Sequence, residues 1–294
     1  MSIESKKPLN LSVIIFGGTS GLGQAISRHL ASLGCQITVV GRSFKDQDLQ
    51  ENIKFKEADL TSLEYTKNLA SELSANISKY DLIVFTTGIF ASSSREETKE
   101  GIERDMAVSY LNRYVLLRNF LPVLSSSSTE SKSANKLGFT RRVVLFGYPG
   151  NGQLGTIEDL NQEKSYSFMK AHMNTVAGNE ALVKYIRLKY PEVEAVGVNP
   201  GLVKTDIRKN LTGTGIFSRM LEGVLGAFNP TPEQFAANIT PSLLQPSLGD
   251  TEFINSKGKS IPGSNKFDND YAMKYIRVSE SLIEQKLGAD FFTA

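Results

Sequence analysis

The sequence has a single cysteine and no long apolar run. Its 294 residues include one cysteine, Cys35, two histidines and no tryptophan. A single cysteine excludes an internal disulfide and is typical of a reducing compartment, so we expect a cytoplasmic protein. The opening stretch "MSIESKKPLN" (1–10) lacks an apolar signal core, and no apolar run reaches the roughly 18 residues that span a bilayer. We therefore expect a polar N-terminal tail over residues 1–10 and no transmembrane segment.

An excess of charge of one sign is also missing. The chain has 33 basic and 31 acidic residues and a net charge of +2. This balance gives no basic surface for nucleic acid or for an anionic membrane, so we expect neither as a partner. We expect a small-molecule substrate and no metal site, and a homo-oligomer stays open.

Short apolar runs recur along the chain, and each ends at turn residues. They are "VIIF" (13–16), "ITVV" (37–40), "DLIVF" (81–85), "RVVLF" (142–146) and "VEAVGV" (193–198). Helical patterns lie between them, and the first of these ends at Gly34. Continuous apolar strands that alternate with helices predict an α/β fold, a Rossmann-type doubly wound parallel sheet. The length suits one large domain over residues 1–294, and no internal repeat or domain boundary is present.

Two segments interrupt this alternation. The polar, low-complexity stretch "SSSSTESKSANKLG" (125–138) is predicted to be a surface loop. The stretch "IFSRMLEGVLGAF" (216–228) has apolar residues at helical spacing, and "GTG" (213–215) precedes it. Glycines there can act as a hinge, so we predict a substrate lid over residues 202–230.

A glycine-rich turn follows the first predicted strand. In "VIIFGGTSGLGQAI", Gly17, Gly21 and Gly23 stand between that strand and the first helix. Glycines at this point allow a tight turn and a close approach of the backbone to a pyrophosphate, which then lies at the helix N-terminus. The sequence therefore predicts a dinucleotide site.

The end of the second predicted strand bears on which dinucleotide binds. An acidic residue there would accept hydrogen bonds from the ribose hydroxyls of NAD. Here the strand ends in "VVGRS", with Gly41 followed by Arg42. A guanidinium suits a phosphate, so we predict NADP, and NAD is not excluded.

Several motifs together resemble the short-chain dehydrogenase/reductase family, over nearly the whole chain. "ADL" (58–60) resembles the adenine contact of the family, "TTG" (86–88) stands where Asn-Asn-Ala-Gly is usual, and "NPGLVKT" (199–205) resembles the segment that closes over the nicotinamide. "FTTGIFAS", "DMAVSYL", "PGNGQ" and "HMNTVA" look like signatures of a fungal (yeast) branch of aldehyde reductases. The glycine turn, Arg42 and this resemblance give as cofactor contacts Gly17, Thr19, Ser20, Gly21, Leu22, Gly23, Arg42, Asp59, Leu60, Thr87, Gly88, Pro200, Gly201, Val203 and Thr205.

The catalytic tetrad of the family is degraded in this sequence. The family uses Ser, Tyr and Lys, often with an Asn on the fourth helix, and the Tyr donates the proton. "MAVSYLNRY" resembles the helix that carries the Asn, but Ser109 stands at its position. "RRVVLFGYPGNG" resembles the strand end that carries the Ser, but Gly147 and Tyr148 stand there.

The stretch "SYSFMKAHMNTVAGN" (165–179) offers two positions for the proton donor. Tyr166 and Lys170 have the four-residue spacing of the family pair, whereas the match of "AHMNTVAGN" places His172 at the Tyr position and Val176 at the Lys position. His172 and Lys170 lie about 200° apart around a helix, so they point to opposite sides. The distance to Pro200 along the chain also favours His172.

The helical stripes agree with that choice. The stripe of His172 continues through Val176, Asn179, Val183 and Ile186 and should face the core, whereas the stripe of Tyr166 continues through Lys170, Met173, Ala177, Glu180 and Lys184 and should face water. We therefore predict His172 as the proton donor, because imidazolium is a usable acid near neutral pH. The Tyr166–Lys170 pair and a buried histidine without chemistry stay as alternatives. Tyr148 and Asn174 are candidate helpers, and His29 is predicted to be structural.

The resemblance implies an enzymatic function, and the altered tetrad leaves two alternatives to it. We expect reduction of small aldehydes or ketones to alcohols with a nicotinamide cofactor, which supplies the hydride. A catalytically inactive dinucleotide-binding sensor or structural protein of the same fold is the alternative, and an isomerase or epimerase that uses bound cofactor is a third.

Overall fold

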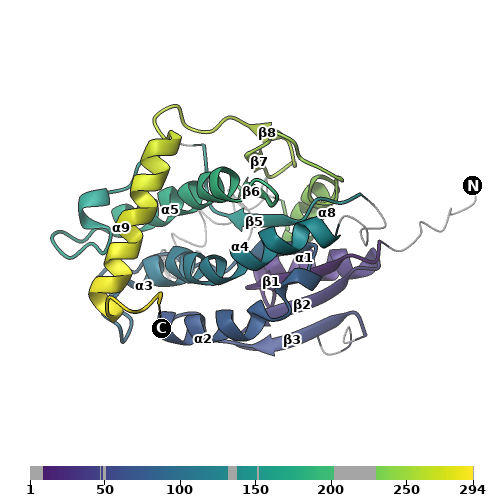
Figure 1. Ribbon diagram of the computed structural model, residues 1–294, viewed down its shortest axis with the longest axis horizontal. Coiled ribbons are helices and arrows are strands. Elements are labelled where there is room, and N and C mark those ends of the chain that lie inside the picture. The colour runs from purple at the N-terminus through teal and green to yellow at the C-terminus, as the bar shows by residue number, and fades with distance from the viewer. Residues whose placement is uncertain are drawn as a thin grey trace, which may run out of the picture.

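The computed structural model describes residues 9–46, 48, 51–131, 138–150, 152–201 and 230–293. Within these ranges one eight-stranded sheet crosses the molecule in the order β3-β2-β1-β4-β5-β6-β7-β8 (Figure 1). The strands are β1 (Ser12–Phe16), β2 (Gln36–Gly41), β3 (Ile53–Glu57), β4 (Leu82–Phe85), β5 (Arg142–Phe146), β6 (Glu194–Asn199), β7 (Phe253–Asn255) and β8 (Ser260–Ile261). Neighbouring strands pair in parallel, except that β7 and β8 are antiparallel. The predicted doubly wound α/β fold is confirmed.

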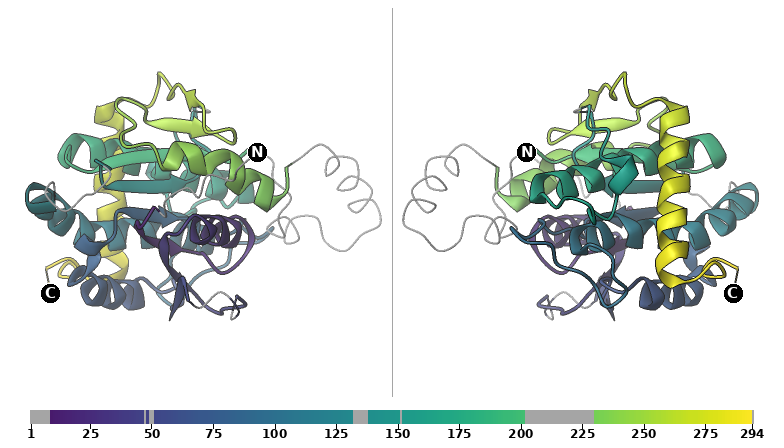
Figure 2. Two further views of the ribbon diagram at one scale, coloured as in Figure 1. Left: turned by 90° about the vertical axis from the view of Figure 1, so that its right-hand side faces the viewer. Right: turned by 90° about the vertical axis from the view of Figure 1, so that its left-hand side faces the viewer.

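Helices cover both faces of the sheet (Figures 1 and 2). They are α1 (Gly21–Ser32), α2 (Leu63–Ser74), α3 (Arg104–Met106), α4 (Asn112–Ser131), α5 (Phe168–Lys189), α8 (Pro232–Leu243) and α9 (Asn269–Leu287), with short helical turns η2 (Ile77–Lys79), η3 (Ala107–Leu111) and η4 (Ile157–Asp159). Helices α1 and α8 pack on one face, over Val13, Ile15 and their neighbours in the sheet. Helices α2, α4, α5 and α9 form the larger core on the other face, over Ile14 and Phe16. Alternate residues of β1 thus enter different cores, which is why its sequence is apolar throughout.

The switch in strand order positions the site. From β1 the chain adds β2 and β3 on one side, and β4 then pairs on the other side of β1. The carboxyl ends of β1 and β4 therefore diverge into different connections, which is where open α/β sheets bind ligands.

The five apolar runs of the sequence all form strands, but β3, β7 and β8 were not predicted. Strand β3 lies at the edge of the sheet, and only one of its five residues is buried. Its sequence, "IKFKE", therefore has lysines between the apolar residues and no continuous apolar run. Strands β7 and β8 have only three and two residues, which is too short for a pattern.

The predicted surface loop over 125–138 is wrong for its first part, because α4 continues to Ser131. Leu121 and Leu124 are fully buried and hold this part of the helix on the core. The hydroxyl of Ser125 donates to Glu192, and that of Ser126 donates to the carbonyl of Val123, so these two serines find acceptors within the fold. Residues 132–137 lie outside the described residues.

Helix α5 corrects a second prediction. The His172 stripe is buried as expected, with Val176 and Asn179 at 3% and 5% exposure. The other stripe does not face water, because Ala177 and Glu180 are also buried. Helix α9 packs against α5, and the Glu180 carboxylate accepts hydrogen bonds from the backbone N–H groups of Gly150 and Ser264. A buried carboxylate with backbone donors can thus sit on a core face that a charge pattern assigns to solvent.

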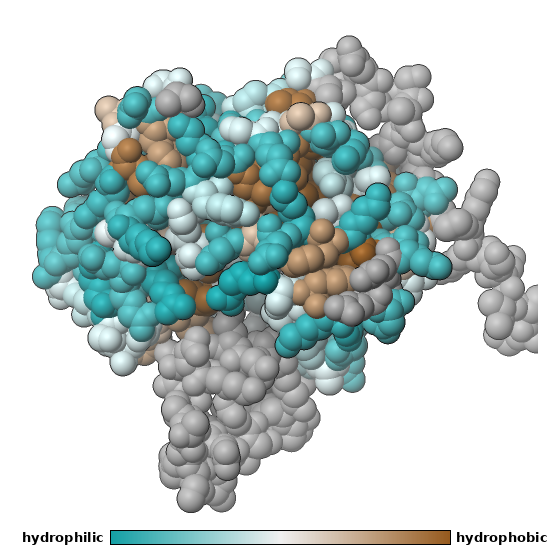
Figure 3. All heavy atoms as spheres, turned by 90° about the horizontal axis from the view of Figure 1, so that it is seen from below, coloured by the Kyte–Doolittle hydropathy of each residue, from teal (hydrophilic) through white to brown (hydrophobic). Residues whose placement is uncertain are grey.

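Hydrophilic residues predominate on the face drawn in Figure 3, and smaller apolar patches lie between them. No helix within the described ranges combines the length and the apolar composition that crossing a bilayer requires. Within the same ranges no cluster of His, Cys, Asp and Glu is arranged to hold a metal ion.

Candidate active site

Two adjoining cavities open at the carboxyl ends of β1 and β4. The first, the glycine-loop cavity, has a volume of about 450 Å³ and is lined by the turn after β1, the end of β2 and the turn after β3. The second, the His172 cavity, has a volume of about 380 Å³ and is lined by the segments after β4 and β5 and by α5. Leu22, Thr86, Thr87, Gly88 and Ile89 line both cavities. A ligand in the first cavity can therefore reach the second without a gap.

The predicted cofactor contacts gather around these cavities. The glycine-loop cavity is lined by Gly17, Thr19, Ser20, Gly21, Leu22, Gly23, Arg42, Asp59, Leu60, Thr87 and Gly88. Pro200 and Gly201 line the His172 cavity. Val203, Thr205 and the predicted lid over 202–230, apart from Pro230, lie outside the described residues.

The turn between β1 and α1 is too tight for side chains. Gly17 and Gly21 have φ angles of 88° and 54°, a region that favours glycine. A Cβ on Gly17 would lie 2.6 Å from the backbone nitrogen of Thr87, and a Cβ on Gly23 would lie 2.3 Å from the carbonyl oxygen of Gly17. The N-cap residue of α1, Ser20, makes no side-chain cap hydrogen bond, so its side chain leaves the first N–H groups of the helix to other acceptors. This cradle fits the pyrophosphate of a dinucleotide.

Two cationic side chains line the glycine-loop cavity. Arg42 is exposed just after β2, and Arg104 comes from α3 and forms an ion pair of 2.5 Å with Glu96. The sequence predicted Arg42 but not Arg104, because nothing near Arg104 in the chain marks it as part of this cavity. Gly41 is required at the strand end, because a Cβ there would lie 2.7 Å from Oγ1 of Thr19. Asp59 accepts a hydrogen bond from the backbone N–H of Thr61.

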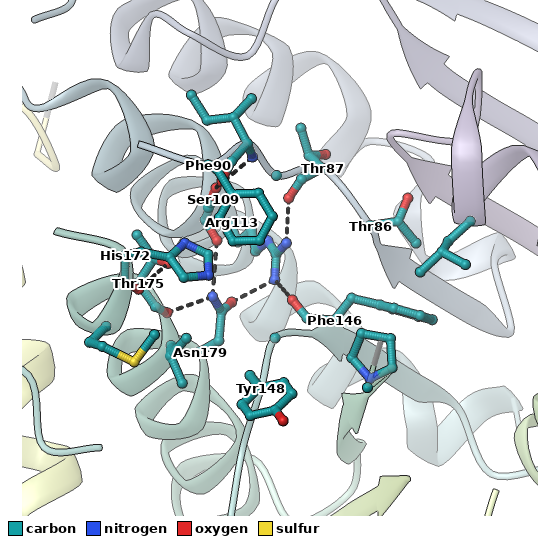
Figure 4. Close-up of a pocket in the computed structure, with 18 of the residues that line it drawn as sticks. Thr86, Thr87, Phe90, Ser109, Arg113, Phe146, Tyr148, His172, Thr175 and Asn179 are labelled. Atoms are coloured by element: carbon teal, nitrogen blue, oxygen red, sulfur yellow. Dashed lines mark hydrogen bonds between the residues drawn. The ribbon is translucent and has the colours of Figure 1, made fainter. Parts of the chain in front are cut away.

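His172 lies in the second cavity (Figure 4), and the carboxylate of Asp105 lies beside it. Its Nδ1 is 2.9 Å from Oδ2 of Asp105, whose side chain is fully buried, while the His172 side chain is 22% exposed. The second oxygen of Asp105 accepts from the hydroxyl of Ser109 at 2.5 Å. Ser109 in turn accepts from the backbone N–H of Ile89. A carboxylate accepts only, so this arrangement places the proton on Nδ1 and leaves Nε2 for a ligand.

Ser109 lies in a π-helical turn, and Asp105 lies four residues before it. Segment η3 (Ala107–Leu111) joins α3 to α4 and is fully buried. A π turn adds one residue to the helical repeat and is frequent at functional sites. Asp105 and Ser109 are four residues apart, so this turn stacks the two side chains on one face.

A buried guanidinium lies under the cavity. Nη1 of Arg113 donates to the carbonyl of Phe146 at 2.5 Å and to Oδ1 of Asn179 at 2.6 Å, and Nη2 donates to the carbonyl of Thr87. Arg113 thereby ties the segments after β4 and at the end of β5 to α5 (Figure 4). Burial lowers the pKa of Arg113 to about 9, and the nearby charge of Asp105 opposes that change.

The other tetrad positions are also altered for a packing reason. At Gly147, the predicted position of the family serine, a Cβ would lie 3.2 Å from the Cβ of Asn179, so a side chain there would crowd α5. Val176, at the Lys position, is buried in the cavity wall. The Phe90 ring packs against His172 with centroids 4.5 Å apart, which shields the imidazole from solvent.

The alternative donor pair lies elsewhere. Tyr166 precedes α5, its hydroxyl donates to the carbonyl of Ser92 at 2.6 Å, and burial raises its pKa to about 12. Lys170 is exposed in the first turn of α5. Neither residue lines either cavity. Of the candidate helpers, Tyr148 lines the His172 cavity, whereas Asn174 is buried and accepts from the backbone N–H of Thr156.

Curated relatives resemble the chain over most of its length. An uncharacterized oxidoreductase of Saccharomyces cerevisiae is 40% identical over 281 residues, which cover 94% of this chain and 89% of the relative. The polyprenol dehydrogenase of Homo sapiens is 24% identical over 251 residues, which cover 78% of this chain and 73% of the relative.

Solved structures share the fold. An uncharacterized protein of Mycobacterium paratuberculosis superposes with a TM-score of 0.62 at 20% identity, with 93% of each chain covered. A short chain dehydrogenase of Shigella flexneri, solved in complex with NADP, has a TM-score of 0.59 at 15% identity and covers 86% of this chain and 100% of its own. At these identities the likeness shows the fold alone.

A family model described as short chain dehydrogenase matches residues 12–132, which include the glycine turn, Asp105 and Ser109. The expected resemblance is therefore confirmed by sequence relatives and by fold. Together with a relative 40% identical along 94% of this chain, this match shows that the chain belongs to the short-chain dehydrogenase family.

Proposed function

We propose that this NAD(P)-dependent oxidoreductase interconverts an aldehyde or ketone with the corresponding alcohol, and that His172 moves the proton. One observation carries the proposal: Nδ1 of His172 is held by the buried Asp105 at 2.9 Å, in a cavity that adjoins the glycine-loop cavity. The histidine thus takes the position of the family tyrosine. The human relative is named a dehydrogenase of polyprenol, an alcohol, which supports a carbonyl–alcohol conversion.

The residues of this chain then divide the work. A nicotinamide dinucleotide, when bound, supplies or accepts the hydride. For reduction, the imidazolium of His172 donates the proton on Nε2 to the carbonyl oxygen, and for oxidation the neutral ring accepts a proton there. Asp105 holds Nδ1–H in place and stabilises the positive charge of the ring. Phe90 and the apolar wall keep water away from the proton transfer.

The glycine-loop cavity supports NADP over NAD as the preferred cofactor. Arg42 and Arg104 both line it, and no carboxylate stands at the end of β2. Two guanidinium groups suit a 2′-phosphate and would gain little from a free ribose hydroxyl.

The test is turnover. With butanal and NADPH or NADH, the parent protein should oxidise the cofactor, and His172→Ala should lower kcat by about 10²–10⁴-fold, the usual contribution of a positioned acid. His172→Ala should bind cofactor as the parent does. Tyr166→Phe and Lys170→Met serve as controls and should keep most of the activity. A nearly inactive Tyr166→Phe beside an active His172→Ala would overturn the assignment of the donor. A parent without turnover of any carbonyl or alcohol would favour a protein that only binds the dinucleotide.

A further inference from the structure

Ser109, Thr175 and Asn179 line the His172 cavity, and their hydroxyl and amide groups are already bonded within the protein. The hydroxyl of Thr87, which lines both cavities, is buried and has no partner among the described residues. The Ser109 hydroxyl donates to Asp105, and the Thr175 hydroxyl donates to the carbonyl of His172 at 2.8 Å. The amide nitrogen of Asn179 donates to the carbonyls of Ser109 and Thr175 at 3.0 and 2.7 Å. A hydroxylated substrate would therefore have to break buried hydrogen bonds in order to bond to Ser109, Thr175 or Asn179.

The one cation that lines this cavity within the described residues has both terminal nitrogens occupied by the protein, and its Nε, which has no partner, is itself buried. Arg113 is 2% exposed, and both of its terminal nitrogens donate to groups of the protein, namely the carbonyls of Thr87 and Phe146 and the amide oxygen of Asn179. A carboxylate or phosphate on the substrate would leave these acceptors without donors. The cavity thus has no anchor for an anionic substrate group among the described residues.

Large apolar side chains gather where the cavity meets solvent. Tyr148, Phe168 and Met169 line the cavity and are 39%, 37% and 51% exposed. Exposed apolar groups that cluster at a cavity mark a binding surface rather than chance exposure. Deeper in, the wall is made of Ile89, Phe90, Phe146, Met173 and Val176.

Size points the same way. The volume of about 380 Å³ lies within the roughly 300–1,000 Å³ of pockets that enclose ligands of drug size. Pro200 and Gly201, which are predicted cofactor contacts, also line this cavity, so a bound cofactor takes part of the volume. In the part that remains, a longer hydrocarbon chain buries more apolar surface than a two-carbon aldehyde and gains binding energy from it.

We infer that the site takes aldehydes and alcohols with an unsubstituted hydrocarbon chain longer than a few carbons, whose chain packs against Met173 and, at the opening, Phe168 and Met169. This inference rests on the proposed function. The reacting oxygen meets Nε2 of His172, and the rest of the substrate meets carbon and sulfur. Aldehydes with hydroxyl or carboxylate groups are poor substrates.

The first experiment is a chain-length series with the full chain. kcat/KM for acetaldehyde, butanal, hexanal and octanal should rise by about fourfold for each added methylene, the ratio that corresponds to ~0.8 kcal/mol per buried CH₂. Glyceraldehyde and glyoxylate should react more slowly than butanal. A flat series, or a preference for glyceraldehyde or glyoxylate, would overturn the inference and leave the proposed function intact. No turnover with any of these carbonyls would overturn the proposed function, and the inference with it.

The second experiment changes the opening of the cavity. Met169→Glu places a charge at the opening, and an acid in the first turn of a helix is favourable to its stability. It should lower kcat/KM for octanal at least about tenfold more than kcat/KM for acetaldehyde. Leu188→Glu is the matched control, since Leu188 is 48% exposed on the same helix and does not line the cavity. An equal loss for both aldehydes would contradict the inference.

Binding gives a readout apart from turnover. Titration of octanol into the protein with NADP, followed by calorimetry at several temperatures, should give a negative heat-capacity change, because apolar surface is buried. Met169→Glu should weaken this binding, whereas Leu188→Glu should not. A heat-capacity change near zero, or equal affinity in the parent and Met169→Glu, would count against the apolar site.

Discussion

Nδ1 of His172 and Oδ2 of Asp105 are 2.9 Å apart, although they are 67 residues apart in the chain. The pair joins the first turn of helix structure after β4 to the first turns of α5, and Asp105 is fully buried. A buried carboxylate in contact with one ring nitrogen decides which nitrogen carries the proton. The other nitrogen, Nε2, is then left to exchange a proton with a ligand. In a His–Asp pair of this kind the carboxylate orients the ring and stabilises its positive charge.

Asp105→Asn should reduce turnover while the fold persists, because the amide is close in size to the carboxylate. The amide has a single acceptor oxygen and no negative charge, so it cannot accept hydrogen bonds from both Ser109 and His172. The ring therefore loses its fixed tautomer and the stabilisation of its positive form. We expect kcat to fall by about 10³–10⁴-fold, as when the carboxylate of an Asp–His pair is removed. The measurement is steady-state reduction of butanal or octanal, with cofactor affinity determined by fluorescence as a check on folding. Ser109→Ala is the control and should cost less, and equal activity in Asp105→Asn and the parent would remove the pair from the mechanism.

The sequence could predict His172 but not its partner. The apolar stripe of α5 and the Pro-Gly spacing are local patterns, and they placed His172 toward the core. Asp105 comes from a three-residue helix far away in the chain, and no local pattern joins it to His172. A signal was nevertheless present, because Asp105 precedes Ser109 by one helical turn, and Ser109 stood at a tetrad position.

The same limit applies to the fold. Strands buried on both faces produce long apolar runs, so all of the inner strands through β6 could be predicted. Glu180 was assigned to solvent because a charge pattern cannot reveal that Gly150 and Ser264 supply its hydrogen bonds. Burial raises the pKa of this carboxyl group, while the two backbone donors oppose that change. Tertiary partners of this kind are absent from any local window of sequence.

Arg42→Ala should narrow the difference in affinity between NADPH and NADH. Arg42 is exposed and lines the glycine-loop cavity, so its loss removes one charge-assisted contact with a 2′-phosphate and leaves the turn after β1 intact. We expect the affinity for NADPH to fall about tenfold or somewhat more, with that for NADH little changed. Fluorescence titration of both cofactors measures this. Equal affinities for the two cofactors in the parent would contradict the NADP preference.

Gly23→Ala should weaken both folding and cofactor binding. The new methyl group would lie 2.3 Å from the carbonyl oxygen of Gly17, so the turn must move away from α1. Overpacking of this kind costs about 1–3 kcal/mol in the free energy of unfolding, measured by urea denaturation. Gly249→Ala is the control, since its φ is 55° but a Cβ there would contact nothing within 4 Å. It should cost about 1–2 kcal/mol through strain alone and leave the cofactor affinity unchanged. An unaltered cofactor affinity in Gly23→Ala would argue against the glycine cradle.

Tyr166→Phe separates a structural role of the phenol from a catalytic one through its dependence on pH. Burial raises the pKa of Tyr166 to about 12, whereas an unfolded tyrosine titrates near 10. Between these values the unfolded chain loses the proton and the folded protein keeps it, so the contribution of Tyr166 to stability is complete below about pH 10 and is lost as the pH rises toward 12. At pH 8 the variant should be less stable by about 0.5–1.5 kcal/mol, because the hydrogen bond to the carbonyl of Ser92 is removed. This difference should shrink in urea titrations from pH 10 to 12, since the other buried tyrosines are common to both proteins.

Turnover at pH 7 should stay near that of the parent, because a phenol that donates to Ser92 has no proton to offer in the His172 cavity. A constant stability difference combined with lost turnover would instead return the donor role to Tyr166 and Lys170.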